Sequence, residues 1–162
     1  ETETRGGFRI VQPGEGESTW QPVPANGHVS VLLAPHLVAM EQRFAMGTQM
    51  VAPHSHVREH AHDRNEEVIH CLAGSGTAIV DGECHPMRPG TTLFLGRNRW
   101  HSFVNDGESD LIFLWLLLPN GLETFFAAIG RPRREGEAPP PNFPRPDDVL
   151  EIERRTVFAP PR

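Results

Sequence analysis

The stretch His60-Ala61-His62-Asp63-Arg64-Asn65-Glu66-Glu67 places two imidazoles and three carboxylates within eight residues of a 162-residue chain. His60 and His62 are two residues apart, and on a strand such residues project from the same face, so both rings are predicted to converge on one point. Glu67 begins an apolar run and would reach that point from a neighbouring antiparallel strand. His101, after a polar turn, begins a further predicted strand.

Three imidazoles and one carboxylate form a mixed nitrogen and oxygen donor set. This set suits Fe, Mn, Co, Ni, Cu or Zn, whereas Ca and Mg prefer oxygen ligands alone. A six-coordinate ion held by four side chains would keep about two positions for water or substrate, as catalytic sites do. The sequence therefore predicts a catalytic transition-metal site.

A second register of histidines lies just upstream, at His54 and His56. In that register the nearby carboxylate would be Glu59, and no glycine follows it at six residues. We therefore favour His60 and His62 as ligands. His54 and His56 are interpreted as part of a solvated loop, with an extra metal contact or a proton shuttle as the alternative.

Short strands joined by turns dominate the middle of the chain. The sequence holds 15 glycines and 16 prolines, and Asp81-Gly82 between two β-rich runs is a strong hairpin signal. Two short strands are expected within 38–51. The run Leu111–Leu118 does not alternate, which predicts cover on one face by the interior and on the other by a second sheet or a second subunit. The pattern indicates an antiparallel sandwich or small barrel.

Two spaced motifs in this region resemble those of the cupin superfamily, over roughly residues 47–118. The first consists of His60 and His62, Glu67 after four further residues, and Gly74 after six more. The second runs from Gly90 through Gly96-Arg97-Asn98 and His101 to Asn105, with Gly96-Arg97-Asn98 in place of the family's Pro-x-Gly turn. Glycine and asparagine both tolerate positive φ, so a tight turn remains feasible there.

The resemblance implies an all-β fold, a conical double-stranded β-helix or jelly-roll barrel, with a short C-terminal helical extension. It also implies one divalent metal bound by His60, His62, Glu67 and His101. Glu67 and His101 are taken as catalytic as well. Iron is favoured, while Mn, Ni, Cu and Zn stay open because this donor set accepts most of the first-row series.

Three segments are expected: an N-terminal arm over 1–27, the barrel over 28–118, and an extension over 119–162 that packs on the barrel or on a partner. Within the arm, Phe8–Val11 is a candidate edge strand. In the extension, apolar residues at helical spacing predict a helix that Gly130 stops, then a Pro-rich linker. Asp147-Asp148 is placed to cap a short helix ending near Arg155.

Composition excludes several functions. The net charge of −6 disfavours nucleic acid, and the absence of lysine and tyrosine excludes Schiff-base and phenol chemistry. The longest apolar run is strand-sized, so no membrane span is expected. No signal peptide is visible, and Cys71 and Cys84 are read as free thiols, so a cytoplasmic location is predicted; whether an N-terminal segment was removed stays open.

Several other side chains are expected near the metal. Ile69, Leu95 and Phe103 would form an apolar wall that excludes water. Arg97 and Arg99 could hold a carboxylate or phenolate, or be solvated surface. Further along the metal-bearing strand, Cys71 would share the face of Glu67, whereas Glu66 and His70 would point away.

Three functions are compatible with such a site. The first is a dioxygenase acting on a small phenolic, flavonol-like or dicarbonyl substrate, suggested by likeness to quercetin dioxygenase-like cupins. The second is a non-oxidative zinc enzyme, an isomerase, lyase or polyketide cyclase. The third is a module that binds a small molecule without turning it over.

A homodimer is also expected. Cupin barrels of this kind commonly pair through their outer sheet, and Leu111–Leu118 and the Phe125/Phe126 helix offer apolar contact surface. The arm or the tail would then wrap on the partner.

Overall fold

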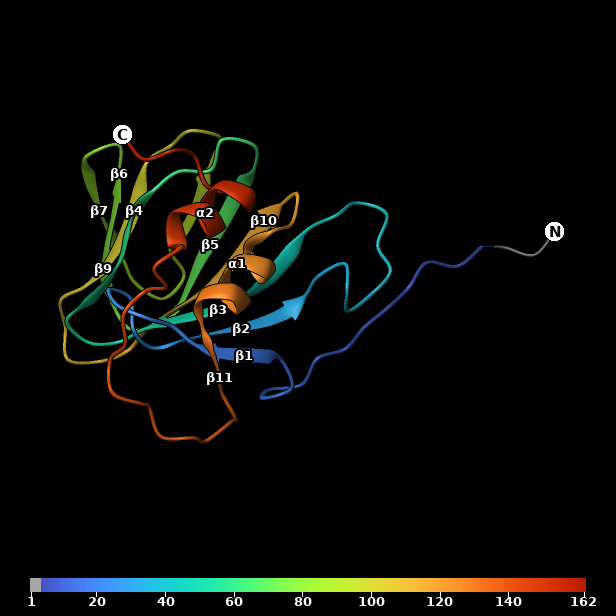
Figure 1. Ribbon diagram of the computed structural model, residues 1–162, viewed down its shortest axis with the longest axis horizontal. Helices are drawn as coiled ribbons and strands as arrows, with labels where there is room; N and C mark the ends of the chain where they lie inside the picture. The colour runs from blue at the N-terminus through green and yellow to red at the C-terminus, as the bar shows by residue number, and fades with distance from the viewer. Residues whose placement is uncertain (1–3) are drawn as a thin grey trace.

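Two antiparallel β-sheets face each other in the computed structural model, which describes residues 4–162 (Figure 1). The larger sheet has the strand order β11 (Arg131–Pro132), β1 (Glu17–Trp20), β2 (His28–Leu33), β3 (Ala45–Val51), β10 (Leu111–Leu118), β5 (Glu66–Ala73) and β8 (Thr92–Leu95). The smaller has the order β4 (Ser55–His60), β9 (His101–Asn105), β6 (Gly76–Val80) and β7 (Glu83–Met87). The predicted all-β jelly roll with a short helical extension is confirmed.

The core lies between the sheets and is built by alternation along the central strands. In β10, Leu111, Phe113, Trp115 and Leu117 are almost completely buried, and the residues between them are half-buried. No second sheet covers that outer face within residues 4–162, so this part of the prediction is wrong. Leucines occupy both faces of β10, which is why no alternation was visible in the sequence. Cover of the outer face by a second subunit, and with it the homodimer, stays a prediction.

The hairpin predicted at Asp81-Gly82 is confirmed. Both residues have positive φ, 49° and 84°, as a two-residue turn between twisted antiparallel strands requires. The turn joins β6 to β7 with Val80 opposite Glu83. Asn98, in the departure from the family's Pro-x-Gly turn, also has a positive φ of 62°, so asparagine meets the need that glycine usually meets.

Two predicted strands are absent from the described residues. Phe8–Val11 forms no strand, and Figure 1 shows this part of the chain extending away from the barrel, with the Phe8 side chain 87 % exposed. Residues 38–44 form bends, so 38–51 contains the single strand β3. Conversely, the predicted arm contains a strand that was not expected, β1 at residues 17–20. The first three residues of the arm lie outside the described part of the chain.

The C-terminal extension folds back onto the barrel. Helix α1 (Leu122–Ile129) ends before Gly130 as predicted, and α2 (Val149–Arg155) follows Asp148, whose side chain forms no capping hydrogen bond. Phe125 and Phe126 are buried against their own chain, which corrects the expectation that this helix supplies an exposed contact surface for a partner.

Within residues 4–162, no helix has the length and apolar character that crossing a bilayer requires.

Gly47 in β3 provides a test of how tightly the sheet is packed. A Cβ at this position would collide with the backbone carbonyl of Ser30 and lie 2.7 Å from the indole ring of Trp115. We expect Gly47→Ala to lower the free energy of unfolding by roughly 1–3 kcal/mol, measured by denaturant titration. Gly6→Ala, where a Cβ meets nothing within 4 Å, is the control and should leave stability unchanged; equal stability of the two variants would contradict this packing.

Candidate metal centre

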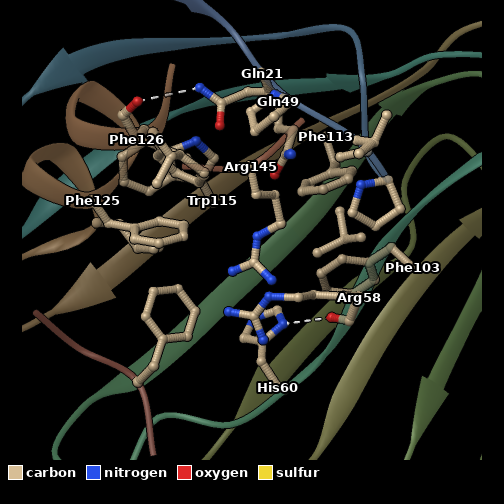
Figure 2. Close-up of a pocket in the computed structure, with 18 of the residues that line it drawn as sticks. Gln21, Gln49, Arg58, His60, Phe103, Phe113, Trp115, Phe125, Phe126 and Arg145 are labelled. Atoms are coloured by element: carbon tan, nitrogen blue, oxygen red, sulfur yellow. Dashed lines mark hydrogen bonds between the residues drawn. The ribbon is translucent and has the colours of Figure 1, made fainter. Parts of the chain in front are cut away.

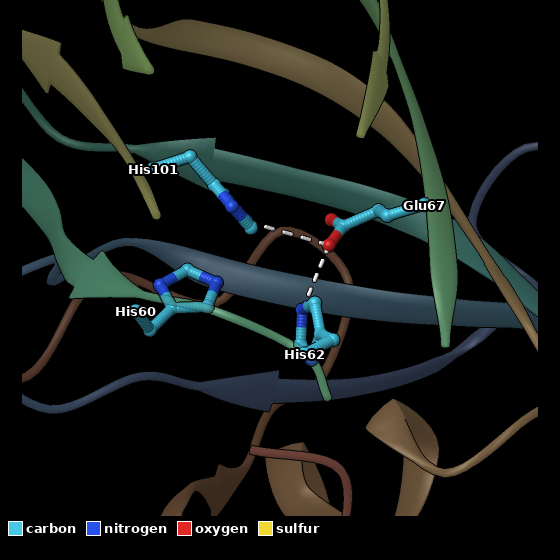
Figure 3. Close-up of side chains that lie close together, drawn as sticks. All are labelled: His60, His62, Glu67 and His101. Carbon is cyan, nitrogen blue, oxygen red and sulfur yellow. Dashed lines mark ion pairs between the residues drawn. The ribbon is translucent and has the colours of Figure 1, made fainter. Parts of the chain in front are cut away.

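Three side chains from the two facing sheets and one from the connection between them meet in the barrel interior. His60 is the last residue of β4 and lies directly opposite His101, the first residue of β9. His62 follows two residues later in the connection to β5, and Glu67 is the second residue of β5. Their ligand atoms all lie within 4.8 Å of one another, and all four residues are buried (Figure 3). The four predicted ligands are therefore brought together.

The route by which Glu67 reaches the site differs from the prediction. We expected Glu67 to come from a strand paired with the His60 strand, but β4 pairs with β9, and β5 belongs to the opposite sheet. The connection 61–65 crosses from one sheet to the other. The residues between His60 and Glu67 therefore cross from the small sheet to the large sheet and do not form a hairpin.

The orientation of all three imidazoles is set by the backbone. The Nδ1 atoms of His60, His62 and His101 lie 2.8 Å from the carbonyl oxygens of Arg58, Val157 and Arg99, respectively. A carbonyl oxygen only accepts, so each Nδ1 must carry the proton and donate it. Each Nε2 is then left with a lone pair, and this is the arrangement that metal-binding histidines usually have.

The inward-facing donor atoms lack partners. The Nε2 atoms of His62 and His101 and Oε2 of Glu67 are buried without a hydrogen bond. Glu67 Oε2 lies 2.8 Å from His62 Nε2 and 3.6 Å from His101 Nε2, distances at which lone pairs face one another. Ligands bound to one ion at about 2.1 Å are separated by comparable distances, so the donor set fits a divalent transition metal.

Charge and burial shift the pKa values of these groups in the metal-free protein. Burial, together with the neighbouring His101 and His62 rings, holds the pKa of His60 well below its usual value. Burial alone would lower the pKa of His62 and raise that of Glu67. The contact with Glu67 outweighs burial at His62 and raises the pKa of His62. The contacts with His101 and His62 outweigh burial at Glu67 and strongly lower the pKa of Glu67.

The C-terminal tail forms part of the surroundings of the site. Val157 supplies the carbonyl that orients His62, and the Phe158 ring lies 5.3 Å from the His60 ring and 5.1 Å from that of His62. The backbone N–H of Ala159 donates to the carbonyl of Ala61 between the two ligands. These residues were not predicted, because nothing in their local pattern indicates a contact with residues almost a hundred positions earlier.

A pocket opens beside the cluster and is lined by His60 and Glu67 (Figure 2). Its wall is mainly apolar, with six Phe and Trp rings, and its polar side chains include two arginines and two glutamines. The aromatic and polar residues of the wall are Phe103, Phe113, Trp115, Phe125, Phe126, Phe158, Gln21, Gln49, Arg58 and Arg145. The site therefore combines metal-ligand chemistry with space for an apolar guest.

The expectations for neighbouring residues are met in part. Ile69, Leu95 and Phe103 are buried, and Phe103 lies on the pocket wall as predicted. Arg97 and Arg99 do not line this pocket; Arg99 instead pairs with Asp81 at 2.8 Å on the surface. The arginines that do face the pocket, Arg58 and Arg145, were missed.

The remaining histidines and cysteines lie outside the cluster. His54 and His56 are exposed, His54 contacting Glu108 and His56 standing on β4 instead of in the predicted loop. His70 points away from the site and contacts Thr92, as expected. Cys71 is a free, buried thiol that does not line the pocket.

Comparison with known proteins agrees with this geometry. The sequence pattern of the Cupin domain family matches residues 47–117. Protein SchB of Streptomyces halstedii is 34 % identical over 97 residues, a match that covers 56 % of this chain and 70 % of SchB. The chain belongs to the cupin superfamily.

Other cupin relatives carry different descriptions. Polyketide synthase CurC of Streptomyces cyaneus is 29 % identical over 93 residues, covering 57 % of this chain and 60 % of CurC. Quercetin 2,3-dioxygenase of Bacillus subtilis is 32 % identical over 74 residues, covering 46 % of this chain but 22 % of that enzyme. The polyketide cyclase RemF of Streptomyces resistomycificus shares the fold, with a TM-score of 0.60 and 21 % identity over 68 % of this chain and 79 % of RemF.

Removal of a ligand tests the centre directly. We expect the wild-type protein to bind about one transition-metal ion per chain, and His62→Ala or His101→Ala to reduce this to a small fraction, measured by elemental analysis after dialysis. His70→Ala is the matched control, because His70 lies on β5, the strand that carries Glu67, and contacts Thr92 outside the cluster. Full metal content in both ligand variants would contradict the assignment.

Metal affinity should also weaken on acidification. The ion binds neutral imidazole, and the raised pKa of His62 means that a proton begins to compete with the metal already above about pH 6.5. His60, with a lowered pKa, stays neutral over this range. A competition titration with a chelating dye should show affinity falling as the pH is lowered toward about 6.5, the ordinary pKa of imidazole; a flat profile would be inconsistent with protonation of this cluster.

Proposed function

We propose that this cupin is a metal-dependent enzyme that promotes ring closure in a poly-β-ketone or related aromatic polyketide without consuming oxygen. One observation carries the proposal: His60 and Glu67 belong both to the four-ligand cluster and to the lining of the pocket with its aromatic rings. The polyketide descriptions of CurC and RemF support this substrate class. We propose zinc as the metal.

When bound, a divalent ion supplies Lewis-acid polarisation of a carbonyl or enolate oxygen. The aromatic wall excludes water from the substrate and orients its flat body. Within the described part of the chain, His60 and Glu67 are the histidine and carboxylate that line the pocket. We therefore assign proton transfer to Oε1 of Glu67, the carboxylate oxygen that does not face His62 and His101, and the catalytic contribution of His101 to its place in the ligand set.

The apolar side chains strengthen the electrostatics of the site. Phe103 is buried next to His101, with ring centroids 5.7 Å apart, and Phe158 lies against the rings of His60 and His62. Charges interact more strongly where water is excluded, so developing negative charge on a substrate oxygen would be stabilised here more than in solution.

Dioxygenase chemistry, the first hypothesis from the sequence, is kept as the second candidate. The partial match to quercetin 2,3-dioxygenase favours it, and the same ligand set would accept iron. We rank it second because that match covers 22 % of the dioxygenase, whereas CurC is covered to 60 %.

Product mass separates the two candidates. We expect the zinc-loaded chain, under nitrogen, to accelerate cyclisation of a synthetic linear poly-β-ketone by at least about tenfold over buffer, with loss of water from the product. His101→Ala should abolish the acceleration, while His70→Ala should retain it.

The opposing result is equally specific. If the iron-loaded chain consumes oxygen with quercetin and yields a product that has gained both oxygen atoms, while the poly-β-ketone cyclises at the buffer rate, the second candidate replaces the first. Inactivity with both substrates at full metal loading would leave the non-catalytic binding module as the better account.

A further inference from the structure

Two arginines and one glutamate form a buried cluster at the pocket wall. Arg58 lies on β4, Arg145 lies in the segment before α2, and Glu153 lies on α2. Both guanidinium groups donate to the same oxygen, Oε1 of Glu153. Figure 2 shows the two arginine side chains pointing into the pocket beside His60.

The charges of this cluster do not cancel. Two guanidinium groups and one carboxylate leave one positive charge. Glu153 does not line the pocket and its side chain is 6 % exposed, whereas those of Arg58 and Arg145 are 27 % and 24 % exposed and form part of the wall. The excess positive charge therefore faces the cavity.

This excess charge persists at neutral pH. Burial and the neighbouring Arg145 lower the pKa of Arg58 to about 10, with Glu153 opposing the shift, so Arg58 remains protonated in the cell's pH range. Each guanidinium has five donor N–H groups, and the shared Glu153 oxygen, with the Glu59 carbonyl as a further acceptor for Arg58, cannot satisfy them all. Partial removal of a cation from water is costly where its donors lack partners, and an anionic guest would offset that cost at these partly buried side chains.

The surroundings restrict what such a guest can be. Phe113, Trp115 and Phe125 line the same pocket, so an anion entering it gains most if it is attached to a flat apolar body. The planar fork of an arginine matches a carboxylate, which it can bind through two parallel hydrogen bonds. His60 sits next to this positive wall, so a guest held there would also reach the metal cluster.

We propose that Arg58 and Arg145 form a carboxylate subsite, so that the substrate is a free aromatic or polyketide carboxylic acid and not a neutral ester, thioester or amide. The proposal rests on the proposed function in so far as the pocket is the active site. Glu153 holds the two guanidinium groups together and tunes the net charge of the subsite. Fastening of α2 to the barrel by the same contacts is the structural alternative that the test must distinguish.

Binding of a matched pair of probes tests the subsite. We expect the zinc-loaded full chain to bind 2-naphthoate at least about tenfold more tightly than 2-naphthamide, a neutral probe of nearly the same shape, by isothermal titration calorimetry. Arg145→Gln should bring the two affinities within about threefold of each other by weakening the naphthoate alone. Arg88→Gln, an exposed arginine outside the pocket, is the control and should keep the wild-type preference.

A second variant moves the effect in the opposite direction. Glu153→Gln removes the negative charge and leaves two arginines at the wall, so the preference for naphthoate should rise by several-fold. A purely structural cluster would instead lose affinity for both probes together, and this outcome in the two variants would overturn the proposal.

Four further outcomes are decisive. No preference for naphthoate in the wild type would overturn the proposal. Survival of the preference in Arg145→Gln would also overturn it, because the carboxylate would then be binding the metal. If the wild type prefers naphthoate and Arg145→Gln loses that preference, but no poly-β-ketone is cyclised, the subsite stands and the proposed function falls. If the poly-β-ketone is cyclised but the wild type shows no preference for naphthoate, the proposed function stands and the subsite falls.

Discussion

Three hydrogen bonds from imidazole Nδ1 to backbone carbonyls control the chemistry of this protein. They lock each ring in one tautomer and turn three Nε2 lone pairs inward. Oε2 of Glu67 lies among these nitrogen atoms. The barrel interior therefore contains buried lone pairs, on His62, His101 and Glu67, that accept no hydrogen bond from the protein. Such groups are costly to bury, so the arrangement is consistent with stabilisation by a cation.

The rest of the fold can be understood as support for this cluster. The small sheet supplies His60 and His101 in direct register, the large sheet supplies Glu67 from the opposite side, and the tail supplies the carbonyl that orients His62. The ligands thus come from segments that must all be folded before the site exists. Metal binding and folding of the C-terminal tail should consequently be coupled.

Much of this could be predicted from short-range spacing. The positions of His60, His62, Glu67 and His101 in two spaced motifs identified the ligands, and Asp81-Gly82 identified a hairpin because its turn type demands positive φ. What failed depended on long-range packing. Packing of the extension on the barrel was one of the two expected outcomes, but nothing local to Arg145 or Phe158 indicates that these residues line the pocket beside His60. Leucine on both faces of β10 also hid the alternation between its buried and outer faces.

X-ray absorption spectroscopy of the bound metal would identify its ligands. We expect multiple-scattering features of about three imidazoles, with the remaining ligands oxygen and none of them sulfur. A spectrum with a sulfur ligand, or with no imidazole, would contradict this expectation, because the ion would then lie away from this cluster.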